Sequence, residues 1–113
     1  MKLTHSFNPY VRNAEVPKEM RLEDGEGNVL VFKVLGFLST AFRKANDAKY
    51  KDDAARGMAM FKALIAEVPE GLELEDGTPV TSKNLDKLAE EAPWLISQVI
   101  EFAKGHSEFD PKP

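Results

Sequence analysis

A hairpin signal between residues 20 and 35 most constrains what this chain can fold into. Met20-Arg21-Leu22-Glu23 alternates apolar and polar side chains, which is typical of a half-buried strand. Asp24–Asn28 favours a turn because Gly, Asp and Asn tolerate positive φ angles. Val29–Leu35 is rich in β-branched and apolar residues and predicts the return strand, which Gly36 ends. A lone hairpin is marginal in water, so it must pack on other elements or pair with another chain.

A helical pattern follows the hairpin. Ser39 is a favourable N-cap, because its hydroxyl can accept a hydrogen bond from a free backbone N–H of the first turn. Thr40–Val68 carries apolar residues at three- and four-residue spacing, and Pro69 and Gly71 end the pattern. The polar stretch 46–53 leaves two interpretations open. The segment is one long helix, or it is two shorter helices with Asp52 or Asp53 capping the second.

The C-terminal half predicts a turn and two more helices. Asp76-Gly77 is a turn signal, and Thr81 or Ser82 is expected to cap a helix. The inner face of that helix comprises Leu85, Leu88 and Ala89. Pro93 suits the first turn of the last helix, and Lys104 and Gly105 predict its end. The apolar face of this helix is wide, which predicts burial on two sides or a contact with another molecule.

These patterns predict an α+β fold that is mainly α, with an N-terminal β-hairpin followed by three to four helices and an extended C-terminal tail. The length of 113 residues corresponds to a single domain. We expect an N-terminal arm at 1–18, the domain at 19–105 and the tail at 106–113. Within the domain, the hairpin is expected at 19–35 and the helices at about 39–68, 81–91 and 93–104.

Charge and composition narrow the functional classes. The net charge of −4 argues against nucleic-acid binding, which needs clustered Lys and Arg. Arg43–Arg56 holds several basic residues, but interleaved aspartates make it typical of a solvated helix surface. No apolar run is long enough for a membrane span, and the first residues lack a signal core, so we expect neither membrane insertion nor secretion. The absence of cysteine excludes disulfides and thiol chemistry and fits a reducing compartment.

Residues capable of catalysis do not form a recognisable constellation. His5 and His106 lie at opposite ends of the chain without a second ligand at metal spacing, and a surface position is expected for each. Asp52 and Asp53 are adjacent, which on a helix points them in different directions. The serines have no nucleophile-elbow context, and the glycines form no phosphate loop. We therefore expect no enzymatic activity, no cofactor and no metal.

The one tryptophan, Trp94, has two interpretations. It is a partly buried anchor at the start of the last helix, or it is a contact residue for a partner, because tryptophan is enriched in binding hot spots. Burial is the preferred interpretation. Phe109 presents the same choice, since it is an isolated aromatic residue in a proline-bounded tail.

Several short motifs, in their order along the chain, resemble the tail assembly chaperones of long-tailed (siphovirus-type) bacteriophages and prophages. The similarity covers roughly residues 20–110 and is carried by Val34-Leu35-Gly36, Ser39–Ala45, Asp76-Gly77-Thr78-Pro79-Val80, Pro93-Trp94-Leu95, Gln98-Val99, Phe102 and Phe109. The chain departs from the family pattern in two places. Leu38 stands where an acidic residue is common, and Val68-Pro69-Glu70 lacks a tryptophan often found in that turn.

The resemblance implies a non-catalytic role in tail morphogenesis in the host bacterial cytoplasm. Such a protein binds the tape measure protein and tail tube subunits and is absent from the mature virion. We expect Trp94, Leu95, Gln98 and Phe102 of the last helix to contact the partner, with Phe109 assisting, because this helix has an excess of apolar surface beside a tail aromatic. An exposed hairpin edge would also permit a homo-oligomer by strand addition.

Two other functions are consistent with a small, acidic, cysteine-free chain. The first is a regulatory or adaptor protein, such as an antitoxin-like module. The second is a structural tail-completion protein, which would be present in purified virions. Neighbouring genes for the tail tube and tape measure proteins would favour the chaperone, and a neighbouring toxin gene would favour the regulator.

Overall fold

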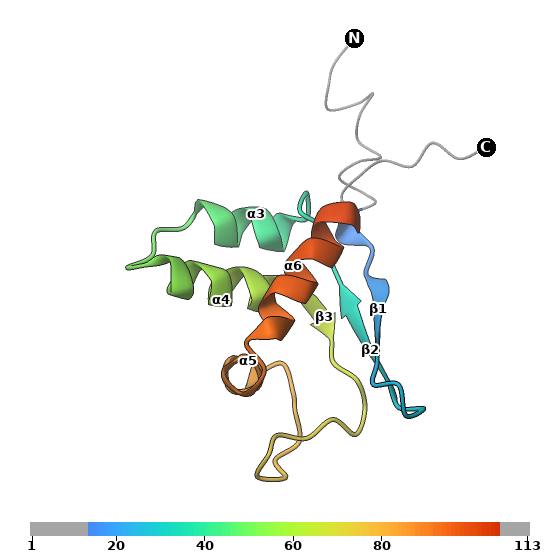
Figure 1. Cartoon of the computed structure of the whole chain (residues 1–113). Helices are drawn as coiled ribbons and strands as arrows, with labels where there is room; N and C mark the ends of the chain where they lie inside the picture. Colours follow the sequence, from blue (N-terminus) through green and yellow to red (C-terminus); the bar gives the residue numbers. More distant parts are fainter. Residues whose placement is uncertain (1–13, 107–113) are drawn as a thin grey trace, which may run out of the picture.

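A computed structural model describes residues 14–106, and the predicted α+β architecture is confirmed. The elements are β1 (Lys18–Glu23), β2 (Val29–Val34), α3 (Thr40–Asp47), α4 (Asp53–Leu64), β3 (Ile65–Glu67), α5 (Leu85–Glu91) and α6 (Trp94–His106). The three strands form one antiparallel sheet in the order β1-β2-β3, and α6 packs across β1 and β2 (Figure 1). Among residues 14–106, no helix has the length and apolar composition needed to cross a membrane.

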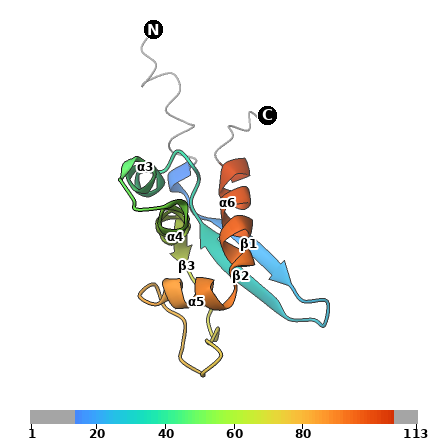
Figure 2. The ribbon, with the colours of Figure 1, turned by 60° about the vertical axis from the view of Figure 1, so that its left-hand side comes forward.

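The hairpin forms with the predicted five-residue loop, and its turn extends past the helices (Figure 2). Asp24 organises the loop, because its Oδ1 accepts hydrogen bonds from the backbone N–H groups of Glu26 (2.8 Å) and Asn28 (3.1 Å). Gly25 and Gly27 adopt the positive φ angles that the turn requires. Met20 pairs with Phe32 on the face of the sheet that carries the core.

The segment after Ser39 resolves into two helices, α3 and α4, which pack against each other (Figure 1). Ser39 caps α3 as predicted, since its Oγ accepts a hydrogen bond from the Phe42 N–H at 3.3 Å. Asp52 caps α4 by accepting from the Ala55 N–H at 2.8 Å. The hydroxyl of Tyr50 donates to the Ala45 carbonyl at 2.6 Å and holds the connection between the helices.

The predicted helix to Val68 is too long, because Ile65–Glu67 is the short strand β3. This strand pairs with the end of β2, where Val34 faces Ile65 and Lys33 faces Glu67. The Leu35 N–H also donates to the Leu64 carbonyl at 2.8 Å. The helix therefore ends at Leu64, although the helical spacing of apolar residues continues to residue 68. Pairing with the free edge of β2 satisfies the backbone N–H and C=O groups of β3 better than another helical turn would.

Two helix boundaries in the second half of the chain differ from prediction. α5 starts at Leu85 instead of about residue 81, because the Asn84 side chain accepts from the Thr81 N–H and donates to the Pro79 carbonyl, which holds 81–84 in turns. α6 continues through Gly105 to His106. The described part of the predicted arm is attached to the domain, since Ala14 is buried and its carbonyl accepts from the Gly36 N–H.

The core lies between the sheet and the helices. Its most buried large side chains are Phe32, Phe61, Leu64, Leu85, Val34 and Val99. The predicted inner face of the α5 segment is confirmed, because Leu85, Leu88 and Ala89 are all buried. His106 was expected at the surface, and this prediction is wrong. Its side chain is 4% exposed, and its Nε2 lies 2.6 Å from the Val16 carbonyl, which accepts a hydrogen bond.

Candidate functional site: the Trp94 hollow

An apolar depression of about 310 Å³ lies where the hairpin, the loop after β3 and the corner between α5 and α6 meet. We call it the Trp94 hollow. Its walls are formed by Leu22, Leu30, Phe32, Leu72, Glu73, Glu75, Leu88, Glu91, Ala92, Trp94 and Leu95. A volume near 300 Å³ is at the lower end of what ligand pockets enclose, so the hollow suits one or two large apolar side chains.

The α5–α6 corner sets the position of Trp94. The Ala92 N–H donates to the Leu88 carbonyl, and the Leu95 N–H donates to the Ala92 carbonyl, both at 2.9 Å. Pro93 lies between these two bonds and continues the chain into α6, which agrees with the expectation that it stands at the start of this helix. The Ser97 hydroxyl donates back to the Trp94 carbonyl at 2.9 Å. The corner is therefore closed by hydrogen bonds on both sides of the proline.

The preferred interpretation of Trp94 is wrong, because the side chain is 58% exposed. Leu95, one residue later, is 2% exposed and belongs to the core with Val99 and Ala103. The helix repeat explains the difference. Residues 95, 99 and 103 form one stripe at four-residue spacing, and Trp94 and Gln98 lie about 100° away from it.

The other predicted contact residues are divided by the structure. Gln98 is exposed on the same flank of α6 as Trp94. Phe102 is half-buried against the core. Leu95 is buried in the core, and it also lines the wall of the hollow. Phe109 lies outside the described residues.

The loop after β3 forms a firm wall of the hollow. Leu74 and Val80 anchor it in the core, and the Leu74 N–H donates to the Thr78 carbonyl at 2.8 Å across a turn with Gly77 at φ +86°. Hydrogen bonds from the hydroxyl and backbone N–H of Thr78 lower the pKa of Asp76 from its usual value. Glu91 ties the loop to α5, since its Oε1 accepts from the Glu75 N–H at 3.0 Å.

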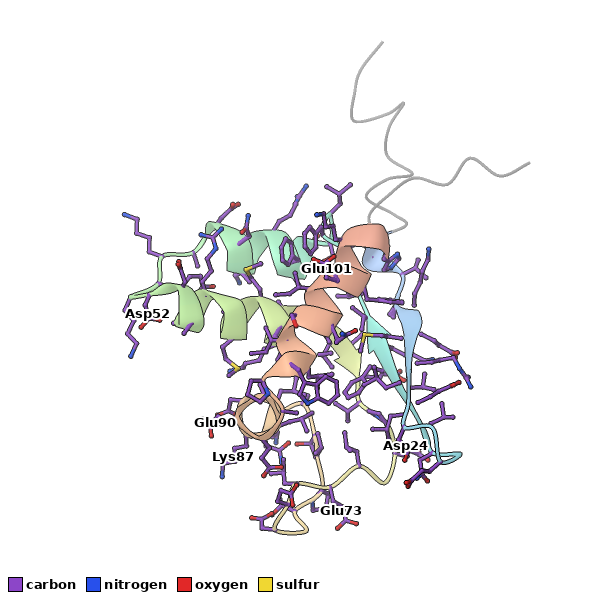
Figure 3. All side chains as sticks on the ribbon, viewed as in Figure 1. Asp24, Asp52, Glu73, Lys87, Glu90 and Glu101 are labelled. Atoms are coloured by element: carbon purple, nitrogen blue, oxygen red, sulfur yellow. The ribbon has the colours of Figure 1, made fainter. Side chains whose placement is uncertain are left out.

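The rim of the hollow is acidic. Glu73, Glu75 and Glu91 line it, and none of its described wall residues is basic. Figure 3 shows Glu73 on the loop after β3. It also labels Lys87 on α5, which is not one of the residues that line the hollow. Carboxylates around an apolar floor and an indole ring favour an occupant with a large apolar group next to a Lys or Arg, which can also stack on the indole face.

The wall residues Leu22, Leu30 and Leu72 are not among the predicted contacts. Leu22 and Leu30 look like ordinary inward-facing strand residues, and Leu72 comes from the loop after β3, which is distant from the hairpin in sequence. One sequence signal could have pointed to Leu22 and Leu30 as surface contacts: they lie next to the hairpin turn, where less of the molecule covers them. In the structure both are half-buried. Within residues 14–106, no group of three or more His, Cys, Asp or Glu side chains is arranged to hold a metal ion.

No protein-family model, curated protein or solved structure matches this chain.

Proposed function

We propose that this protein is a non-catalytic tail assembly chaperone that binds the tape measure protein and tail tube subunits in the host bacterial cytoplasm and is absent from the mature virion. The observation that supports the proposal best is the Trp94 hollow. A chaperone that must later release its partner needs a small apolar surface that water can reach again, and the hollow provides one beside a largely exposed tryptophan.

The size of the hollow favours reversible binding. A site that accepts one or two apolar side chains buries far less surface than a permanent interface of 2,000 Å² or more. The acidic rim adds attraction for basic residues that flank the inserted side chain, and this attraction weakens with salt. The net charge of −4 keeps the free protein soluble between binding events. The resemblance in motif order from Val34 to Phe109 supports the tape measure protein and tail tube subunits as the partners.

Co-purification with fragments of the tape measure protein tests the proposal. Trp94→Ala removes the indole, and we expect affinity to fall about thirty-fold, which corresponds to a hot-spot contribution of about 2 kcal/mol. Val29→Ala is the matched control, because Val29 is 42% exposed and does not line the hollow. Binding that survives Trp94→Ala in a folded protein would contradict the site.

Mass spectrometry of purified particles tests the role. The chaperone proposal predicts that the chain is present in infected cells and missing from finished virions. Stoichiometric recovery from virions would support the tail-completion protein instead. A neighbouring toxin gene, together with binding of its product, would support the regulatory alternative.

A further inference from the structure

A second depression lies on the opposite flank of α6, and residues of α4 and α5 complete its lining. We call it the α4–α6 groove. Its volume is about 520 Å³, and it is lined by Asp53, Ala54, Gly57, Met58, Ala89, Glu90, Pro93, Ile96, Ser97, Ile100 and Glu101. Met58, Ile96 and Ile100 are only half-buried, so the groove exposes part of the apolar surface that α4 and α6 share. It shares no residue with the Trp94 hollow.

Gly57 is the least expected residue in this groove. It lies in the interior of α4, where glycine is less favourable than alanine. Its φ angle is not positive, unlike those of Gly25, Gly27, Gly71 and Gly77. A Cβ atom built on Gly57 would meet nothing within 4 Å apart from its chain neighbours and the backbone of its own helix. Neither the backbone nor the packing of this molecule therefore requires glycine at this position, and its effect is to leave open space in the groove at Gly57.

Small residues continue along the same face of α4. Ala54 lies one turn before Gly57, and both line the groove. Two small residues at this spacing allow the backbone of another helix to approach closely, as glycine generally does where a backbone must come near a ligand. A groove between two helices with an apolar floor is the common seat for an amphipathic helix.

The charges at the rim indicate which helix would fit. Asp53 of α4, Glu90 of α5 and Glu101 of α6 are exposed at the edges of the groove, and no lining residue is basic. Figure 3 shows Glu90 and Glu101 on two of these elements. We propose that the α4–α6 groove binds an amphipathic helix of another protein whose apolar stripe is flanked by Lys or Arg. This proposal goes beyond the chaperone function and does not depend on Trp94.

Two synthetic helical peptides test it against the full chain. The first carries a Leu stripe flanked by Lys and Arg, and the second has the same stripe flanked by Glu. We expect the basic peptide to bind at least tenfold more tightly at low salt, with the difference shrinking as salt screens the rim carboxylates. Equal affinities for the two peptides, or no binding of either, would overturn the proposal.

Substitutions at Gly57 locate the binding. Gly57→Leu places a large side chain in the open space of the groove, and it is expected to weaken binding of the basic peptide at least tenfold. Gly57→Ala is the graded control. It should raise the melting temperature by about 4–8 °C, because alanine favours the helix, while it weakens the peptide less than leucine does. Trp94→Ala should leave peptide affinity unchanged, which separates this site from the chaperone site. Full peptide binding by a folded Gly57→Leu protein would disprove the assignment.

Other occupants give different results in the same assays. A dimer in sedimentation velocity that Gly57→Leu dissociates would show that a second copy fills the groove, and would overturn the proposal. Peptide affinity that rises more than tenfold in the double variant Lys2→Gln, Arg12→Gln would show that the basic N-terminal segment of this chain competes for the groove. That outcome would also overturn assignment to a separate partner.

Discussion

Trp94 and Leu95 are neighbours in the chain, yet one is exposed and the other is in the core. The sequence pattern grouped them as contacts because the last helix has an excess of apolar surface beside a tail aromatic. The four-residue spacing of Leu95, Val99 and Ala103 already indicated the buried stripe. What the sequence could not supply was the width of the face that the sheet covers, because this depends on how α6 crosses β1 and β2.

This difference in burial leads to a stability prediction. Leu95→Ala should lower the free energy of unfolding by about 2–5 kcal/mol, because it leaves a cavity in the core. Trp94→Ala should lower it by about 1 kcal/mol or less, because most of the indole is already in water. Urea denaturation followed by circular dichroism measures both. A Trp94→Ala protein as unstable as Leu95→Ala would mean that the indole is a core anchor after all.

Glu15 leads to a prediction of pH dependence. Hydrogen bonds from the backbone N–H and the hydroxyl of Thr40, with the nearby charge of Arg43, lower the pKa of Glu15 below its usual value of 4.5. A carboxyl with a lowered folded-state pKa adds stability above its unfolded pKa and loses it as the pH falls through the folded pKa. Glu15→Gln should therefore lower the melting temperature at pH 7 and have little effect at pH 2–3.

Glu19→Gln is the control for this experiment. Glu19 is an exposed residue of β1, and the hydrogen bond from the Thr40 N–H is accepted by Glu15 and not by Glu19. Melting temperatures measured between pH 2 and 7 for the three proteins provide the comparison. A Glu15→Gln protein that loses the same stability at every pH would show that the hydrogen bond to Thr40, rather than the ionised carboxylate, is what matters.

At the scale of elements, the sequence predicted correctly those features that depend only on residues close together in the chain. The Asp24–Asn28 turn, the Ser39 cap and the inner face of α5 need only neighbouring residues, and all three are confirmed. β3 was missed because Ile65 continues the helical spacing, and only the free edge of β2 makes a strand better. The Trp94 hollow combines the hairpin, the loop after β3 and the α5–α6 corner, which are distant in sequence, so neither its shape nor its acidic rim could be derived before the topology was known.

The break between α3 and α4 gives a prediction at this scale. Asp52→Ala removes the carboxylate that accepts from the Ala55 N–H, and it should cost about 1 kcal/mol of stability. Asp53→Ala removes only a charge near the positive end of α4, which is worth about 0.3–1 kcal/mol and is sensitive to salt. Thermal unfolding at low and high salt separates the two. Equal, salt-dependent losses would mean that Asp52 acts through its charge and not as a cap.

At the scale of the whole molecule, the two depressions flank α6 and share an acidic character. The excess apolar width predicted for this helix is thus divided between the core and two surfaces that water reaches. The turn end of the hairpin and the hollow lie at the same end of the sheet, since Leu22 and Leu30 pair next to the turn and also line the hollow. A partner seated in the hollow would therefore contact strands as well as helices.

The tryptophan itself reports most directly on the central proposal, that a tail-assembly partner binds in the Trp94 hollow. Trp94 is the only tryptophan of the chain, so its fluorescence can be followed while a tryptophan-free fragment of the tape measure protein is added. We predict a saturable blue shift of the emission, because the indole, now 58% exposed, would leave water as the partner covers it. Saturating binding of the fragment with unchanged Trp94 emission would contradict the proposal.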